Sequence, residues 1–171
     1  MVAGDGSWKL DLFRPWVLDE IINKIIGVPP PHPSSDGSVR FDEGFTADGG
    51  CVRNHNGEWI NGFAKYLGNC IVLEVELWGI LDGLNLILDR HFEKILIQTD
   101  NIEAINIILE DSSGSSNSSL VRKIHLILRK IEQWKIQYIL REENLIADCL
   151  AKSVHTRRLG LRLFENPPLG V

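Results

Sequence analysis

Carboxylates in four separate segments are the side chains whose types and positions suggest chemistry in this chain. Asp100 ends the segment K-I-L-I-Q-T-D, and Asp148 lies in an apolar helical segment. Glu74 and Glu76 lie in the first turn of a long amphipathic segment, and further acids lie in an early extended segment. Four carboxylates that meet at one edge of a sheet would bind two divalent cations roughly 3.5–4 Å apart, an arrangement that promotes in-line attack on a phosphodiester.

Asp100 follows a run of aliphatic residues, 94–99, that lacks polar alternation and therefore predicts a strand buried on both faces. Residues at the carboxyl end of a central strand lie at the mouth of an α/β sheet, where side chains are free to hold a ligand. The alternative is that Asp100 only caps the helix that begins near Asn101. Asp148 raises a related question, because a carboxylate among alanines and aliphatics is costly unless it has a partner.

The elements that must position these acids start with short extended segments. Alternation predicts strands over residues 39–42, 51–53 and 59–64, with residues 46–50 as a turn. Asn56-Gly57 is a strong hairpin signal, because both residues accept positive φ. We therefore expect three antiparallel strands first.

Helical periodicity dominates the rest of the chain, with two further strands between the helices. The expected helices cover residues 73–90, 102–110, 120–131 and a final segment from about residue 145, and the expected strands cover 94–100 and 134–140. Residues 111–119 are almost all serine, glycine and asparagine and predict a surface loop. Charges at positions 122, 123, 129 and 130 favour a solvated helix face over one that contacts phosphates.

Composition places the chain among ordinary globular proteins. Its 171 residues are 44% hydrophobic and 24% charged, and the net charge of −5 argues against a general basic surface for nucleic acid. Three widely spaced cysteines form neither a disulfide framework nor a zinc motif. With no signal-like or membrane-spanning segment, we expect an intracellular protein, cytoplasmic or nuclear, that is not secreted and is monomeric.

The proline run at residues 29–33 divides the chain. Before it, spacing of aliphatic residues at positions 17, 21, 22 and 25 predicts a short helix, and the run itself predicts a stiff connector. We therefore expect an N-terminal connector over residues 1–37, one domain over 38–156 and a C-terminal tail over 157–171.

Several short sequence motifs resemble those of a known family. They are C-V-R-N-H-N-G-E-W-I-N-G-F-A at 51–64, V-E-L-W-G at 75–79, Q-T-D-N at 98–101 and R-E-E-N-L-I-A-D-C-L-A-K at 141–152. Together they resemble the ribonuclease H domain of plant non-LTR retrotransposons and their host-encoded relatives, over about residues 38–154. The resemblance implies an α/β fold of the ribonuclease H type, with a mixed five-stranded sheet flanked by helices.

The resemblance also implies site residues, a cofactor and a substrate. Glu76, Asp100 and Asp148 match the family's helix, strand-end and final-helix acids, which with a first-strand aspartate bind Mg²⁺, or Mn²⁺ in its place. The first-strand word is damaged here; Asp42 fits the apolar alternation best, and Asp36 and Glu43 are the alternatives. The implied activity is cleavage of the RNA strand of RNA–DNA hybrids, with no small-molecule cofactor and no membrane partner.

A second departure from the family concerns Tyr138, which stands ten residues before Asp148 where the family commonly has a histidine. A phenol with a pKa near 10 does not relay protons at neutral pH as imidazole does, so turnover should be impaired. His125 and His155 look like surface residues rather than substitutes. The alternative function is a noncatalytic nucleic-acid-binding or structural remnant; an integrase-like or resolvase-like nuclease fits the words less well.

Overall fold

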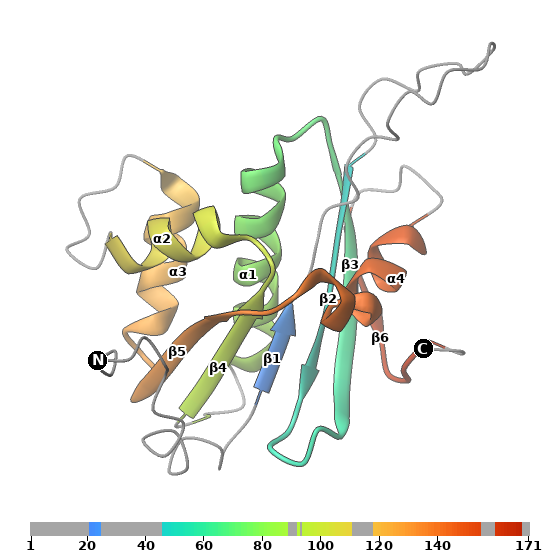
Figure 1. Ribbon diagram of the computed structural model, residues 1–171, viewed down its shortest axis with the longest axis horizontal. Helices are drawn as coiled ribbons and strands as arrows, with labels where there is room; N and C mark the ends of the chain where they lie inside the picture. The colour runs from blue at the N-terminus through green and yellow to red at the C-terminus, as the bar shows by residue number, and fades with distance from the viewer. Residues whose placement is uncertain are drawn as a thin grey trace, which may run out of the picture.

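The computed structural model describes residues 21–24, 46–88, 92, 94–110, 118–154 and 160–168. Within them a six-stranded mixed sheet has the strand order β5-β4-β1-β2-β3-β6. The strands are β1 (Ile21–Lys24), β2 (Thr46–Arg53), β3 (Trp59–Gly68), β4 (Lys94–Thr99), β5 (Gln133–Tyr138) and β6 (Leu161–Phe164). The helices are α1 (Val72–Leu88), α2 (Ile102–Glu110), α3 (Ser119–Leu128), the short 3-10 turn η4 (Arg141–Glu143) and α4 (Leu145–Lys152). Figure 1 shows α1, α2 and α3 gathered beside β4 and β5, with α4 beside β2, β3 and β6.

The first part of the sheet is antiparallel, as expected, and the β2–β3 hairpin turns at the predicted Asn56-Gly57. Gly57 adopts φ 79°, and its backbone N–H donates to the carbonyl of Asn54 at 2.8 Å. Positive φ at this position is what glycine permits at little cost. The hairpin prediction is confirmed.

The prediction of a turn over residues 46–50 is wrong, because these residues form the first half of β2. Gly49 serves close packing instead. A Cβ atom at Gly49 would lie 2.5 Å from the backbone nitrogen of Ala151 and 2.8 Å from the carbonyl oxygen of Ala147, both on α4. Gly49 therefore lets the backbone of α4 approach the sheet, a use of glycine that a local pattern does not distinguish from a turn.

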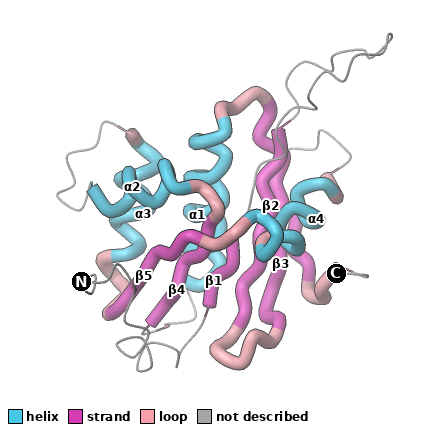
Figure 2. The backbone as a smooth tube through the Cα atoms, viewed as in Figure 1, coloured by secondary structure: helices cyan, strands magenta, loops and turns pink. Residues whose placement is uncertain are grey.

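The predicted helix before the proline run is also wrong where the structure describes it. Residues 21–24 form β1, which pairs antiparallel with β2 and parallel with β4 (Figure 2). The sheet supplies two hydrogen-bonding neighbours that the sequence does not reveal, and short aliphatic segments take the state that their partners favour. β1 thus enters the sheet although it precedes the boundary expected near residue 37. The expected strand at 39–42 lies outside the described residues, and the boundary stays a prediction.

Two apolar layers cover opposite faces of the sheet. Val52 packs with α1 and with Ile95 and Ile97 of β4, in a cluster that α2 and α3 complete. Ala47 and Cys51, on the other face of β2, pack with Leu150 of α4. Because side chains alternate along a strand, this split places α4 opposite α1.

The expected helices and the last two strands are confirmed to within a few residues. In β4, however, only one face is fully buried: Ile95, Ile97 and Thr99 are buried, and the alternate residues are half-buried. The expectation of burial on both faces is wrong because α4 packs on β2 and β3. β6, in the segment expected to be a tail, adds a strand to the expected five.

Candidate active site at the sheet edge

Glu76 lies in the first part of α1 and is 1% exposed. The hydroxyl of Thr99, the last residue of β4, donates a hydrogen bond to Glu76 Oε2 at 2.9 Å. Glu74, the other acid of this turn, is exposed. A buried carboxylate needs hydrogen-bond partners to offset its lost hydration, and Thr99 supplies one. Of the two glutamates, Glu76 is therefore the one that is held against the end of β4.

Asp100 directly follows β4 and is half-buried. The side-chain amide of Asn144, which is 3% exposed, donates to Asp100 Oδ1 at 3.2 Å. Asn101 caps α2, because the backbone N–H of Ala104 donates a hydrogen bond to Asn101 Oδ1 at 3.0 Å. Asp100 keeps its place at the carboxyl end of a parallel strand, where ligands bind in α/β sheets.

Asp148 lies in the first turn of α4, four residues after Asn144. Its backbone N–H donates to the carbonyl of Asn144 at 3.2 Å. Lys152, one turn further along, donates to Asp148 Oδ2, and Asp148 Oδ1 is buried with no hydrogen-bond partner within the described residues. The partner that the sequence required for this carboxylate is thus a lysine on the same helix.

These contacts join α1, the end of β4 and the start of α4 at one edge of the sheet, which we call the acidic edge: Glu76 and Asp100 with Thr99 and Asn144, and Asp148 one helical turn after Asn144. Thr99 connects α1 to the end of β4, and Asn144 connects Asp100, the residue after β4, to the start of α4. Asn144 was not singled out from the sequence, although it stands in the R-E-E-N word four residues before Asp148. The spacing of one helical turn was the available signal.

The first-strand acid has no described counterpart. Asp42 and its alternatives Asp36 and Glu43 lie outside the described residues. β1, which holds the central place in the sheet between β2 and β4, reads I-I-N-K and contains no carboxylate. Across the described ranges, no group of three or more His, Cys, Asp or Glu side chains is arranged to hold a metal ion. The described carboxylates therefore do not fit a complete metal site by themselves, and no catalytic step through a metal follows from them.

Comparison with known families assigns most of the chain to one of them. The family model described as "Reverse transcriptase-like" matches residues 34–154. The chain belongs to this family. It is 30% identical over 136 residues to an Arabidopsis thaliana protein named "Putative ribonuclease H protein", a match that covers 79% of the chain and 22% of the relative. The chain thus spans about a fifth of the length of that relative.

Solved structures show the same fold. The ribonuclease H1 of the halophilic archaeon Halobacterium salinarum superposes with a TM-score of 0.58 at 16% identity, covering 78% of this chain and 95% of that one. LC11 ribonuclease H1, solved in complex with an RNA/DNA hybrid, gives 0.58 at 16% identity and covers 78% and 94%. The protease–reverse transcriptase of prototype foamy virus gives 0.59 at 17% identity, covering 81% of this chain and 21% of that one. The expected ribonuclease H fold is confirmed.

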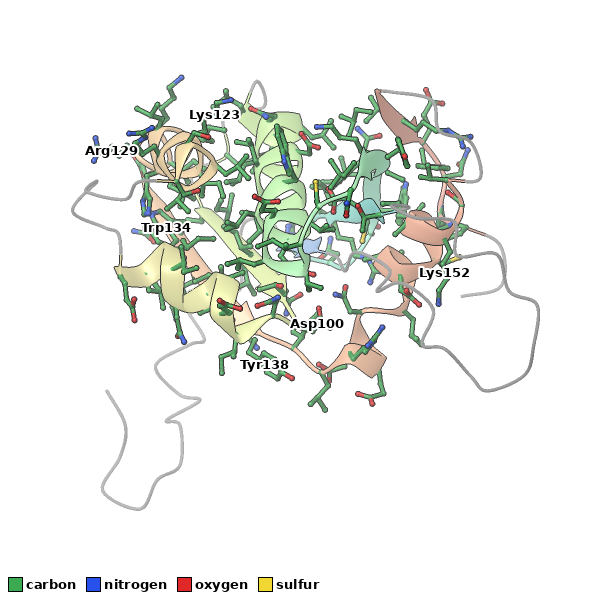
Figure 3. All side chains as sticks on the ribbon, turned by 90° about the horizontal axis from the view of Figure 1, so that it is seen from above. Asp100, Lys123, Arg129, Trp134, Tyr138 and Lys152 are labelled. Carbon is green, nitrogen blue, oxygen red and sulfur yellow. The ribbon has the colours of Figure 1, made fainter. Side chains whose placement is uncertain are left out.

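In this ribonuclease H fold, Tyr138 ends β5 and pairs in register with Thr99. Its side chain is exposed, at 47%, and Figure 3 shows it next to Asp100. The backbone N–H of Ile139 donates to the Thr99 carbonyl at 3.0 Å, which keeps the end of β5 beside the end of β4. The phenol therefore stands at the acidic edge. The expectation that His125 is a surface residue is wrong, because it is 6% exposed on α3; His155 lies outside the described residues.

Further ionisable groups are buried in the described part of this fold. Burial raises the pKa of the Cys51 thiol under α4, although Arg53 opposes the shift, so a thiolate is disfavoured there. Asp48, which the sequence placed in a turn, is fully buried on β2 in register with Lys65, whose ammonium pairs with Asp82 at 2.9 Å. No helix among the described residues has the length and apolar character of a membrane span.

Proposed function

We propose that this chain is a ribonuclease H-type domain that binds RNA–DNA hybrids and hydrolyses their RNA strand. The proposal is supported most directly by the hydrogen bonds that bring Glu76, Asp100 and the start of α4 to one sheet edge. The LC11 relative of the same fold was solved with an RNA/DNA hybrid. Selectivity for RNA would come from contacts to 2′-hydroxyls across the minor groove.

We further propose Glu76, Asp100, Asp148 and Asp42 as ligands of Mg²⁺ or Mn²⁺, with Asp36 and Glu43 as the alternatives to Asp42. Two-metal catalysis, in which bound cations lower the pKa of the attacking water and stabilise the leaving oxygen, is the chemistry that such carboxylates serve. In this proposal the chain's own contacts position the acids: Thr99 orients Glu76, and Asn144 orients Asp100. Endonucleolytic cutting within the hybrid is the expected product pattern.

We propose that turnover is impaired. Tyr138 occupies the position where the resemblance implies a histidine, and a phenol is a poorer proton relay than an imidazole. Lys152 forms an ion pair with Asp148. This ion pair must break before the Asp148 carboxylate can bind a metal cation. Both features lower the rate of a domain that still binds its substrate.

The second candidate is a noncatalytic domain that binds nucleic acid or is purely structural. Two observations favour it: the described acids do not form a metal-binding group, and β1 brings no carboxylate to the centre of the sheet. A fold outlives its chemistry because core patterning tolerates substitution, whereas a metal site needs every ligand.

A labelled RNA–DNA hybrid separates the two candidates. The full chain is incubated with the hybrid and Mg²⁺ or Mn²⁺, beside the matched variant Asp100→Asn, which keeps the size of the side chain and removes its charge. The proposal expects RNA fragments from the parent chain and far fewer from D100N. Equal absence of fragments from both proteins, with the hybrid still bound, supports the noncatalytic domain.

A metal titration gives a second readout that does not depend on turnover. A cation that binds only the folded state raises the melting temperature by mass action. We expect Mg²⁺ or Mn²⁺ to raise the melting temperature of the parent chain more than that of D100N. Identical melting curves with and without cation, in both proteins, would count against the proposed ligands.

A further inference from the structure

Positive charge is concentrated on α3 and the two residues that follow it, in contrast to the chain as a whole. The chain has 18 lysines and arginines against 23 acids, yet residues 112–131 contain four lysines or arginines, one histidine and no aspartate or glutamate. The basic residues Arg122, Lys123, Arg129 and Lys130 are all exposed. An acidic protein that keeps one strongly basic segment has a local field that attracts anions there.

Part of this segment surrounds a hollow, which we call the α3 hollow. Arg122, His125, Leu126 and Arg129 line a volume of about 160 Å³. The four residues follow a spacing of three, one and three, which places them along one side of the helix. Lys123 and Lys130 belong to the same basic segment but do not line the hollow. The hollow has room for a group several times the size of a water molecule, whose share of liquid volume is about 30 Å³.

The polar groups around the hollow lack protein partners. His125 is 6% exposed, and its Nε2 is buried without a hydrogen-bond partner anywhere in the part of the chain that the structure describes. Neither Arg122 nor Arg129 has an ion pair within these same residues. Buried polar atoms in native proteins are nearly always paired, so the unpaired Nε2 of His125 points to a missing partner. Arg122 and Arg129 are exposed, and their guanidinium groups are available to a ligand.

The chemistry of the lining selects the ligand class. Two guanidinium groups match the oxygens of a phosphate, and an imidazole nitrogen can donate a third hydrogen bond. Leu126, which is 59% exposed, gives the hollow an apolar side. An apolar wall beside cationic groups suits a phosphate that carries a sugar better than it suits a free phosphate ion, which is hydrated on all sides.

The α3 hollow is separate from the acidic edge. Figure 3 shows Lys123 and Arg129 at one corner of the molecule, apart from Asp100 and Tyr138. We propose that the α3 hollow binds a backbone phosphate of a nucleic-acid strand, as a second contact away from the candidate active site. This inference rests on the nucleic-acid binding in the proposed function, but not on cleavage.

Two double variants of the full chain test the proposal. Arg122→Gln with Arg129→Gln removes the guanidinium groups of the hollow. Lys123→Gln with Lys130→Gln removes the same charge from the same basic segment and leaves the lining of the hollow intact. Binding of a fluorescein-labelled RNA–DNA hybrid is measured without divalent cation, at several salt concentrations, after circular dichroism has shown that both variants fold.

We expect R122Q/R129Q to weaken binding about tenfold. The slope of log affinity against log salt, which is negative, should become shallower by about 1, as loss of one phosphate contact predicts. K123Q/K130Q should change the affinity much less. His125→Phe, which removes the ring nitrogens, should weaken binding in the same direction by a smaller factor.

The outcomes separate this inference from the proposed function. Equal losses in the two double variants would show diffuse charge attraction and overturn the site, as would an unchanged affinity in R122Q/R129Q. Saturable binding of millimolar inorganic phosphate that depends on Arg122 and Arg129, with hybrid binding unaffected, would overturn the backbone assignment. Hybrid binding that depends on these arginines in a chain that cuts nothing would support the site and contradict the cleavage.

Discussion

The acidic edge and the α3 hollow differ in whether their charged side chains have partners among the described residues. Glu76 and Asp100 of the acidic edge, and Asp148 one helical turn after Asn144, are each held by a protein donor, from Thr99, Asn144 and Lys152 respectively. Around the α3 hollow, the guanidinium groups have no ion pair within the described residues. Held groups are positioned before a ligand arrives, whereas open groups are available to bind one. The fold therefore fixes the positions of the acids through hydrogen bonds, whereas the guanidinium groups beside the hollow remain available for the proposed phosphate.

The largest expected effect comes from removing the support of the acidic edge. Gly49→Val places side-chain atoms where the backbone of α4 lies within 3 Å. Overpacking of this kind costs about 3 kcal/mol or more when backbone must move. Urea unfolding followed by circular dichroism measures the loss, and the edge should lose hybrid cleavage with it.

Gly57→Ala is the matched control, because its Cβ meets nothing within 4 Å and only its positive φ is strained. We expect it to cost about 1 kcal/mol. Equal destabilisation by the two substitutions would show that α4 does not depend on Gly49.

Thr99→Val tests how firmly Glu76 is held. The variant keeps the shape of the side chain but removes the hydroxyl that donates to Glu76 and accepts from the backbone N–H of Asn101. Leaving these buried groups with fewer partners should cost about 1–3 kcal/mol in free energy of unfolding. Thr99→Ser retains the hydroxyl and should cost less. A stability unchanged by T99V would mean that the hydrogen bond does not organise the acidic edge.

Tyr138→His tests whether the edge lacks only a proton-transfer group. Imidazole titrates near neutral pH, and a positioned general acid or base contributes about a hundredfold or more in good geometry. Because the geometry around residue 138 is not optimised for a histidine, we expect a smaller gain. The initial rate of hybrid cleavage in Mg²⁺ should rise about tenfold. Tyr138→Phe should leave the rate unchanged. A lower rate in Y138H than in the parent chain would argue that the phenol itself assists the substrate.

The smallest effect comes from freeing Asp148. Lys152 is 59% exposed, and an exposed pair at this spacing stabilises a helix by only about 0.3–0.5 kcal/mol. Lys152→Gln should therefore change the melting temperature little in the absence of metal. It should enlarge the rise in melting temperature caused by Mg²⁺ or Mn²⁺, since the carboxylate is then available. A smaller rise than in the parent chain would show that Lys152 helps to build the site.

Much of the fold was predictable because its elements carry strong local patterns. The 3.6-residue period of α1 and α3 and the Asn56-Gly57 hairpin do not depend on distant residues, and the structure has each of them at the expected place. Glu76 and Asp100 were identified from the words around them, and the structure brings their elements together. The ligand roles of these residues stay a prediction.

The errors fall where a residue's role depends on what lies across the fold. Gly49 and Gly50 were taken as turn residues because glycine has the same local meaning in a turn and in a crowded strand. Burial of His125 depends on the packing of α3 against its neighbours, and the charges beside it hid that burial. β6 escaped notice because four residues alone do not favour a strand without β3 beside them.

By itself the sequence determined which segments are helical, where the chain turns at Asn56-Gly57, and to which family its acidic words belong. Only the tertiary structure decided that I-I-N-K becomes a central strand and that Asn144 joins Asp100 to α4. Helical periods and turns are set by neighbours a few residues away, which a sequence displays directly. Sheet pairing and the partners of buried polar groups are set by residues far along the chain, and they exist only once the layers have packed.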